Sequence, residues 1–245
     1  EDKNMAASNE YSIQWKGSAG PARSCGTLLQ AKKLYKGALA MAVNGVAQPL
    51  LSGTSLIAKC LTVAGADANG AVILRALRRG VRIVFAGGTS KTLGVSVSVG
   101  ANTDVTVQLG TDNADAVTST GAEVVDAIRG HAMAAGLLVA QATGTGAGLA
   151  AAVAATAVPF IMVLGWASKS YGDAGSGSDQ SIEMLFYTGC AMLGPKSSDA
   201  PVRAAIGGPC WLEDDVTCRA TPVAIDLTAT LADVDSSGYP YIEVR

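Results

Sequence analysis

Short apolar runs separated by turn residues dominate the first part of the chain, and this pattern predicts β structure. The runs LYKGALAMAV, VAQPLL and LIAKCLTVAG are separated by Asn44-Gly45 and by Ser52-Gly53-Thr54. Asn-Gly between apolar runs is a strong hairpin signal, because both residues tolerate a positive φ. Asn69-Gly70 repeats the signal before AVILRAL. We therefore expect short strands and hairpins over residues 25–80.

The middle of the chain, residues 81–158, combines strand patterns with one helical pattern. VRIVFAG, LGVSVSVG and DVTVQLG predict strands, and the second of these alternates strictly. After them, Ser119 or Thr120 can cap a helix and Glu123 supplies an acidic first turn. The apolar positions that share one face of this helix are Val124, Val125, Ile128 and Ala132. With a further strand in LLVAQATG, this part is predicted to be a small α+β domain.

Residues 159–245 return to short strands with Gly, Pro, Asp and Ser turns about every ten residues, a pattern typical of a barrel or sandwich. The predicted fold is mainly β, a small barrel or sandwich of short strands, with an inserted α+β domain. The predicted organisation is an extended N-terminal arm (1–24), a discontinuous β domain (25–80 and 159–245) and the insertion (81–158).

The predicted arm carries apolar side chains at alternate positions, namely Tyr11, Ile13 and Trp15. Such alternation forms a strand only where a sheet edge is supplied. One interpretation is an unstructured terminus, and the other is a segment that docks on a partner. Tyr11, Ile13 and Trp15 are therefore the candidate partner-contact residues.

Composition narrows the class of protein. The chain is 49% hydrophobic but 5% aromatic and 16% charged, with 29 Gly among 245 residues, which suits a turn-rich chain and argues against disorder. A formal net charge of -2 gives no electrostatic reason to expect nucleic acid or an anionic membrane as partner. The five Cys residues include no CxxC, so free thiols in a reducing cytosol are expected. The first twenty residues are polar and contain no apolar core region, so a signal peptide is not expected.

One uncharged stretch, residues 144–165, is long enough to span a bilayer. Its first half is Ala and Gly, and Pro159 interrupts it. A buried Ala-rich segment followed by a strand from Pro159 to Gly165 is the better prediction.

The acidic run Asp233-Val-Asp235-Ser-Ser-Gly238 matches the first half of a calcium loop. Such a loop also needs a bidentate Glu at its twelfth position. That position is Val244 here, and Glu243 comes one residue early. A turn between two strands accounts for Asp, Ser and Gly equally well, and it is our prediction.

Other motifs for chemistry fail on their spacing. In FAGGTSKTLG, Ser90 stands where a phosphate loop needs Gly before Lys91, and ATGTGAG has GxGxG in place of GxGxxG. The single His, His131, lies in the predicted helix with no GxSxG nucleophile motif in the chain. The cluster Arg75-Ala-Leu-Arg78-Arg79 is expected at a solvated strand end, with an acidic protein surface as the alternative. We predict no catalytic residue, no cofactor and no metal site, and hence a protein that is not an enzyme.

Residues 31–50, AKKLYKGALAMAVNGVAQPL, contain a Tyr-Lys-Gly step, a hairpin and a Pro-terminated strand. In this region and in a second one, the chain resembles bacteriophage capsid decoration (cement) proteins. The second runs from IMVLGWASKSYGDAGSGSDQSIEMLFYTGCAML through WLEDDVTCRATPVAIDLTATLADVDSSGYPYIEVR. This chain departs from the pattern of those proteins at two places. The order of Val216 and Thr217 is the reverse of theirs, and Tyr-Pro-Tyr replaces their Trp-bearing strand. The middle of the chain, with TDNADAVTST before its helix, resembles a strand–helix module of phage structural proteins, including sheath-like ones.

The resemblance implies a virion structural protein that binds the outside of a capsid shell and stabilises it without catalysis. The implied partners are the major capsid protein and further copies of this chain in a homotrimer, with no nucleic acid and no membrane. The implied location is the exterior of the virion capsid, after synthesis in the bacterial host cytoplasm. Two alternatives stay open: a phage tail tube or sheath-like subunit, and a host-surface or glycan-binding module.

Overall fold

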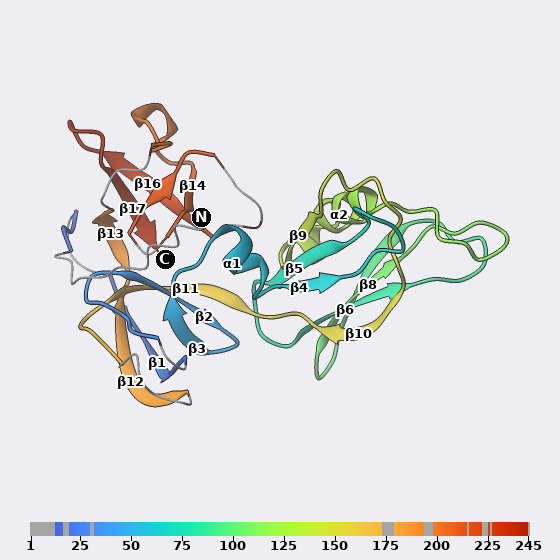
Figure 1. Ribbon diagram of the computed structural model, residues 1–245, viewed down its shortest axis with the longest axis horizontal. Helices are drawn as coiled ribbons and strands as arrows, with labels where there is room; N and C mark the ends of the chain where they lie inside the picture. Colours follow the sequence, from blue (N-terminus) through green and yellow to red (C-terminus); the bar gives the residue numbers. More distant parts are fainter. Residues whose placement is uncertain are drawn as a thin grey trace. The chain divides into compact units, whose positions relative to one another are not determined.

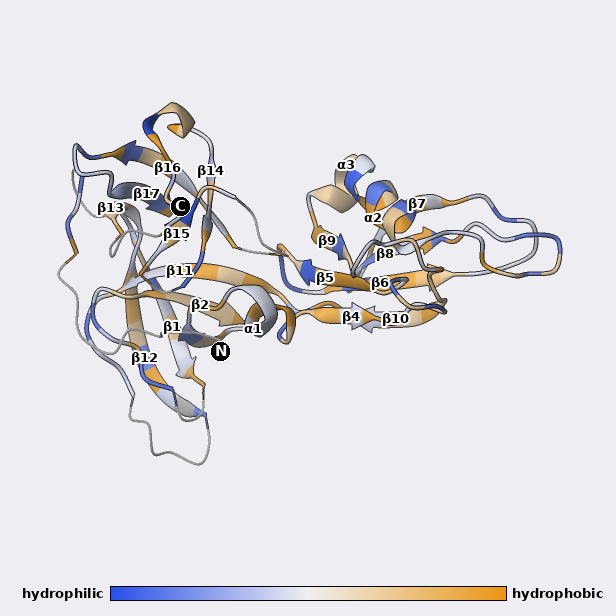
Figure 2. Cartoon of the chain, turned by 45° about the horizontal axis from the view of Figure 1, so that its top comes forward, coloured by the Kyte–Doolittle hydropathy of each residue, from blue (hydrophilic) through white to orange (hydrophobic). Residues whose placement is uncertain are grey.

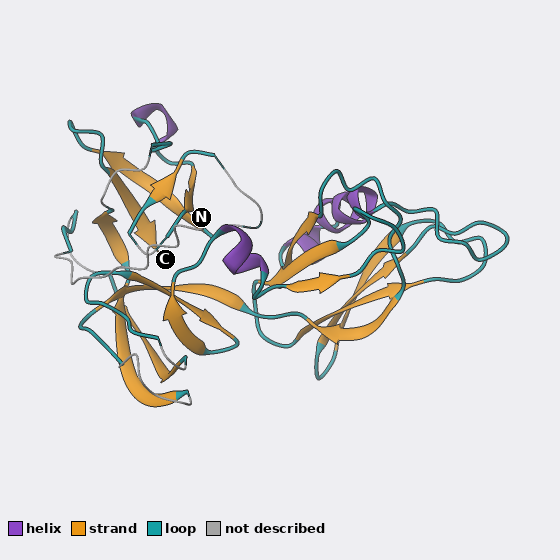
Figure 3. Cartoon of the chain, in the orientation of Figure 1, coloured by secondary structure: helices purple, strands orange, loops and turns teal. Residues whose placement is uncertain are grey.

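The computed structural model describes residues 13–16, 20–29, 32–172, 179–193, 198–214, 216–221, 225 and 227–244. Strands dominate and helices are few, so the predicted mainly β fold is confirmed (Figure 3). The chain divides into two compact units: unit 1 comprises residues 1–56 and 162–245, and unit 2 comprises residues 57–161.

Unit 1 contains a small closed barrel of five strands in the order β1-β12-β11-β2-β3 (Figure 1). Its strands are β1 (Ala22–Leu28), β2 (Leu39–Val43), β3 (Val46–Pro49), β11 (Ile161–Ala167) and β12 (Gln180–Tyr187). β1 runs antiparallel to β12 and closes the barrel by a parallel contact with β3, from Leu28 to Ala47. Apolar side chains fill the interior, and β11 is hydrophobic along most of its length (Figure 2).

The predicted hairpin at Asn44-Gly45 is confirmed. Val43 pairs with Val46, so these two residues form the whole connection between β2 and β3. Asn44 has φ 52° and Gly45 has φ 92°, as a tight turn with two left-handed residues requires.

A five-stranded sheet forms the rest of unit 1, in the order β13-β17-β16-β14-β15. Its strands are β13 (Gly189–Met192), β14 (Pro209–Leu212), β15 (Cys218–Arg219), β16 (Thr228–Val234) and β17 (Pro240–Val244). One 3-10 turn, η1 (Arg203–Ala205), precedes β14. Thus the chain segments before residue 57 and after residue 161 fold together.

Unit 2 holds two sheets and two helices around one apolar core. The four-stranded sheet has the order β10-β6-β8-β7, and the three-stranded sheet has the order β4-β5-β9. Their strands are β4 (Leu61–Val63), β5 (Val72–Ala76), β6 (Val81–Ala86), β7 (Gly94–Val99), β8 (Thr103–Gln108), β9 (Leu138–Ala142) and β10 (Val153–Ala157). The helices are α2 (Gly121–Gly130) and α3 (Ala132–Ala135).

Helix α2 begins where its capping signal predicts. Thr120 Oγ1 accepts a hydrogen bond from the backbone N–H of Glu123, whose carboxylate accepts one in return from the N–H of Thr120. Val124, Val125 and Ile128 are buried as predicted. The prediction for Ala132 was wrong, because α2 ends at Gly130 and Ala132 is exposed in α3.

Three features differ from expectation. Residues 53–57 form a short helix, α1 (Gly53–Ile57), inside a region predicted to be entirely β. β4 and β5 lie in unit 2 because β5 pairs with β9, whereas the sequence placed residues up to 80 in the flanking β domain. In the basic cluster, Arg78 and Arg79 are exposed just after the end of β5, as predicted, but Arg75 lies within β5 and is 6% exposed. The status of the middle segment as an inserted α+β domain stays a prediction.

Candidate functional site

The N-terminal segment pairs with the edge of β13 in its own chain. The N–H of Lys16 donates to the carbonyl of Cys190 at 2.9 Å, and the N–H of Met192 donates to the carbonyl of Gln14 at 2.9 Å. Between these bonds, Trp15 forms an antiparallel bridge with Ala191. β13 therefore supplies the sheet edge that the alternating pattern requires. Of the three candidate contact residues, Ile13 and Trp15 lie in this segment, and Tyr11 lies outside the described residues.

The indole of Trp15 is the main side-chain anchor of this segment. Its ring lies edge-to-face against Trp166 of β11, with centroids 5.4 Å apart, and against Tyr187 of β12, with centroids 6.1 Å apart. Trp166 is 1% exposed, whereas Trp15 and Ile13 are half-buried. This geometry is the favoured one for aromatic pairs. Trp15 thus makes aromatic contacts within its own chain, and its role in partner contact stays a prediction.

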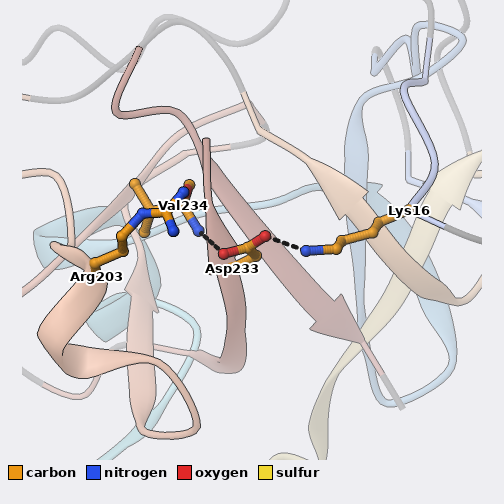
Figure 4. A network of polar contacts seen from close by, with 4 residues as sticks. All are labelled: Lys16, Arg203, Asp233 and Val234. Carbon is orange, nitrogen blue, oxygen red and sulfur yellow. Dashed lines mark hydrogen bonds and ion pairs between the residues drawn. The ribbon is translucent and has the colours of Figure 1, made fainter. Parts of the chain in front are cut away.

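An ion pair fixes the segment beside β16. The ammonium of Lys16 binds the carboxylate of Asp233 (Figure 4). It also lies 5.6 Å from the centroid of the Tyr241 ring. The N–H of Val234 donates to Asp233 Oδ1 at 2.8 Å, while Arg203 donates to the carbonyl of Val234 at 2.7 Å. The bond from Lys16 lowers the pKa of Asp233 most, and the bond from the Val234 N–H adds to the effect. Both charged groups are partly exposed, so the pair positions the segment more than it stabilises it.

The same course continues into the barrel. The N–H of Gly20 donates to the carbonyl of Thr188 at 2.7 Å, and Thr188 Oγ1 donates to the carbonyl of Pro21 at 2.7 Å. A Cβ at Gly20 would lie 2.8 Å from Thr188 Oγ1, so no larger residue fits without displacement. From there β1 pairs with β12. Residues 14–16 and 20–28 therefore follow β13 and β12 in one antiparallel course, from the five-stranded sheet to the barrel.

The acidic run is a turn between β16 and β17, as predicted. Asp235 Oδ1 accepts hydrogen bonds from the N–H groups of Ser237 and Tyr239, both at 2.8 Å. Gly238 has φ 84° and donates to the carbonyl of Asp235. The run's first carboxylate, Asp233, binds Lys16. Both carboxylates therefore have structural partners.

The glycine-rich stretch ATGTGAG caps α2 with its carbonyl groups. The carbonyl of Gly148 accepts from the N–H of Gly121, and the carbonyl of Gly146 accepts from the N–H of Ala122, both at 2.9 Å. The N–H of Glu123 donates to Thr120 Oγ1. These are the donors that bind phosphate in a nucleotide loop, and here protein oxygens already occupy them.

An open pocket of about 280 Å³ lies near this helix end. Its lining residues are Lys91, Thr92, Leu93, Gly110, Thr118, Ser119 and Glu123. Ser119 Oγ accepts from the N–H of Gly110 at 2.7 Å, and the Glu123 carboxylate belongs to the capping box. Ser119 and Glu123, two polar residues of this lining, therefore have partners within the fold.

The single histidine has a local structural role, and the thiols lie partly or fully within the fold. His131 Nδ1 accepts from the N–H of Ala134 at 3.3 Å and so caps α3, as expected for a helix-end histidine. Cys210 and Cys218 are buried, and burial raises the pKa of Cys60 to about 11. Within the described ranges, no group of three or more His, Cys, Asp or Glu residues is placed to hold a metal ion. In that same part of the chain, none of the helices has the length and apolarity to cross a membrane.

The outer face of the barrel carries an apolar pair that the sequence reasoning missed. Leu185 and Tyr187 of β12 are 43% and 36% exposed, while the residues that alternate with them point into the core. Their neighbours across the ladder on β1 are small and exposed: Ser24 opposes Leu185 and Ala22 opposes Tyr187. The available signal was the unbroken apolar run Met184-Leu185-Phe186-Tyr187, because four successive apolar residues in a strand place apolar side chains on both of its faces. Such a face is accessible to a protein partner.

No family model, curated protein or solved structure matches this chain.

Proposed function

We propose that this chain is a structural protein of a bacteriophage particle that binds the outer surface of the capsid and stabilises it without catalysis. One observation carries the proposal. The two segments that resemble decoration proteins, residues 31–50 and 161–245, lie more than a hundred residues apart, and both belong to unit 1 except for the first residue of the second segment, Ile161. Their strands share one barrel, with β2 and β3 from the first segment and β11 and β12 from the second.

The residues that would be candidates for a catalytic or ligand-binding site also support the proposal, because each of them makes a hydrogen bond that stabilises a turn or a helix end. His131 caps α3, Asp235 closes the turn between β16 and β17, and Gly146 caps α2 with its carbonyl. What such a protein contributes is binding energy. A protein that binds only the assembled shell stabilises the shell by mass action, and this stabilisation rises with the logarithm of the ratio of its free concentration to its dissociation constant.

We assign the capsid contact to the outer face of β1 and β12. Leu185 and Tyr187 are the large apolar side chains there, and the residues opposite them on β1, Ser24 and Ala22, are small. Removal of two such side chains from water favours association. Tyr187 also contacts Trp15, so Leu185 is the cleaner position for mutation.

The experiment is co-sedimentation of the purified protein with empty capsids from the same phage. The wild-type protein is expected to move into the capsid fraction, and Leu185→Glu to lose at least about tenfold in affinity through the buried charge. Val202→Glu is the matched control, because Val202 is 64% exposed elsewhere in unit 1. A wild-type protein that stays in the supernatant contradicts the proposal. Polymerisation into tubes without capsids would favour a tail tube or sheath subunit.

A further inference from the structure

β7 is an edge strand of the four-stranded sheet in unit 2. It pairs with β8 along its whole length, from Gly94 opposite Gln108 to Val99 opposite Thr103. Among the described residues, no strand or bridge pairs with its other side. β7 therefore presents one open row of backbone groups (labelled in Figure 2).

The hydrogen bonds of β8 identify which groups form this row. The N–H of Thr103 donates to the carbonyl of Gly80, and the N–H of Leu109 donates to the carbonyl of Ala86, both at 2.8 Å. Odd-numbered residues of β8 therefore direct their backbone groups toward β6. Even-numbered residues of β8 direct theirs toward β7, since backbone groups alternate in direction along a strand.

It follows that the backbone groups of the β7 serines bond to β8, while those of the β7 valines have no strand partner. Ser96 opposes Thr106 and Ser98 opposes Asp104, and both are hydrogen-bonded pairs of the ladder. The N–H and C=O groups of Val95, Val97 and Val99 consequently point away from β8, toward the open edge.

This edge lacks the features that usually prevent strand pairing. Natural edge strands are blunted by charged side chains, prolines or bulges. The six residues of β7, GVSVSV, include no charge and no proline, and the register with β8 is continuous. Val99 is 68% exposed, and Ser96 and Ser98 are exposed on the opposite face.

The sequence around this edge is a palindrome. Residues 94–100 read GVSVSVG in both directions, with Val97 at the centre. In an antiparallel pair of two such strands, Val97 faces its own copy, Val95 faces Val99, and Ser96 faces Ser98. Valines then meet on one face of the joined sheet and serines on the other, both of which are favourable cross-strand pairs.

We propose that β7 is a self-association site, at which two copies of this chain join their four-stranded sheets through antiparallel β7 strands about a two-fold axis. The direction of the backbone groups of β7 is compatible with this register. All three valines have open backbone groups, so Val97 with Val97 and Val95 with Val99 form hydrogen-bonded pairs. A two-fold axis closes the assembly after two copies and leaves no further open β7 edge.

The contact is small, so it gives a weak dimer in free solution. One pair of short strands buries less surface than a stable protein–protein interface requires. When several copies are held on a common surface, the effective concentration rises and the same contact becomes occupied. The inference stands apart from the proposed capsid binding, because its test needs no capsid.

The first test uses two double variants that differ only at position 96. In Ser96→Lys/Ser98→Lys, like charges face each other across the two-fold axis, and dimerisation is expected to weaken at least about tenfold. In Ser96→Glu/Ser98→Lys, each Glu faces a Lys, and dimerisation is expected to return to wild-type strength or above. Both serine side chains are exposed, so both variants are expected to fold. Sedimentation velocity up to about 1 mM protein measures the dissociation constants.

The second test is amide hydrogen exchange at low and high protein concentration. The amides of Val95, Val97 and Val99 are expected to exchange about tenfold more slowly once most of the protein is dimeric. The amides of Ser96 and Ser98 are expected to stay equally protected at both concentrations, because they donate to β8 within each copy. A wild-type protein that stays monomeric throughout overturns the proposal, and so does an oligomer that the Lys/Lys variant leaves unchanged.

Discussion

Replacement of Trp15 by Ala is expected to release residues 13–16 from β13. Burial of about 150 Å² of the indole at about 25 cal/mol per Å² contributes about 4 kcal/mol, and two edge-to-face contacts add about 2 kcal/mol together. The two backbone hydrogen bonds to β13 add about 2 kcal/mol. Fixing four residues costs about 4–8 kcal/mol. The balance is favourable by only about 0–4 kcal/mol, so loss of the indole makes the released state the stable one.

The amide of Met192 reports this release directly, because it donates to the carbonyl of Gln14. Its hydrogen exchange should become about 30-fold faster in Trp15→Ala, because the protection that docking gives cannot exceed the net docking free energy, about 2 kcal/mol at the middle of this range. Global stability should fall by no more than the net free energy of docking, since a released segment has no further contact to lose. Gln14→Ala is the matched control, because the Gln14 side chain is exposed and its backbone carbonyl is retained. Unchanged Met192 protection in Trp15→Ala would refute the reasoning.

Three further outcomes are expected. Thr120→Ala should lower the free energy of unfolding by about 1 kcal/mol in urea melts, because the capping box of α2 is lost, and Thr120→Ser should retain most of it. The rate of Cys60 alkylation by iodoacetamide should rise with pH up to about pH 11 in the folded protein, because burial raises the pKa of this thiol. In urea the rate should level off near the usual pKa of 9.0. Equal pH–rate profiles in the two states would contradict burial as the cause of the raised pKa. Lys16 lowers the pKa of Asp233 below its usual 3.8, so the ion pair contributes to docking of the segment above about pH 4 and is lost as pH falls through the folded-state pKa. Protection of the Met192 amide from hydrogen exchange should fall over the same pH range. Asp233→Asn should abolish this pH dependence.

Local signals in the sequence predicted most of the secondary structure. The Asn44-Gly45 hairpin, the capping box at Thr120 and the alternating strand at residues 94–99 each depend on neighbours within a few positions. Such interactions are readable from one sequence, because turn residues and capping side chains act on the backbone next to them.

Features set by distant partners were not predictable in the same way. Arg75 is buried because β5 lies between β4 and β9, and nothing near residue 75 identifies β9 as the neighbour. In the candidate site, the alternation of Ile13 and Trp15 predicted a strand in need of an edge, but not that β13 supplies it. The ion pair of Lys16 with Asp233 joins residues more than two hundred positions apart, so no local pattern shows it.

The closed barrel has a consequence for synthesis on the ribosome. β1 must wait for β12, whose last residue, Tyr187, is made long after Ala22, its partner in the ladder. Unit 2, by contrast, is one continuous stretch of chain, and all its strands are complete before β12 exists. β1 and β2 therefore leave the ribosome before their barrel partners β12 and β11 are made, and each has one open edge exposed to other nascent chains for as long as translation of the middle segment takes.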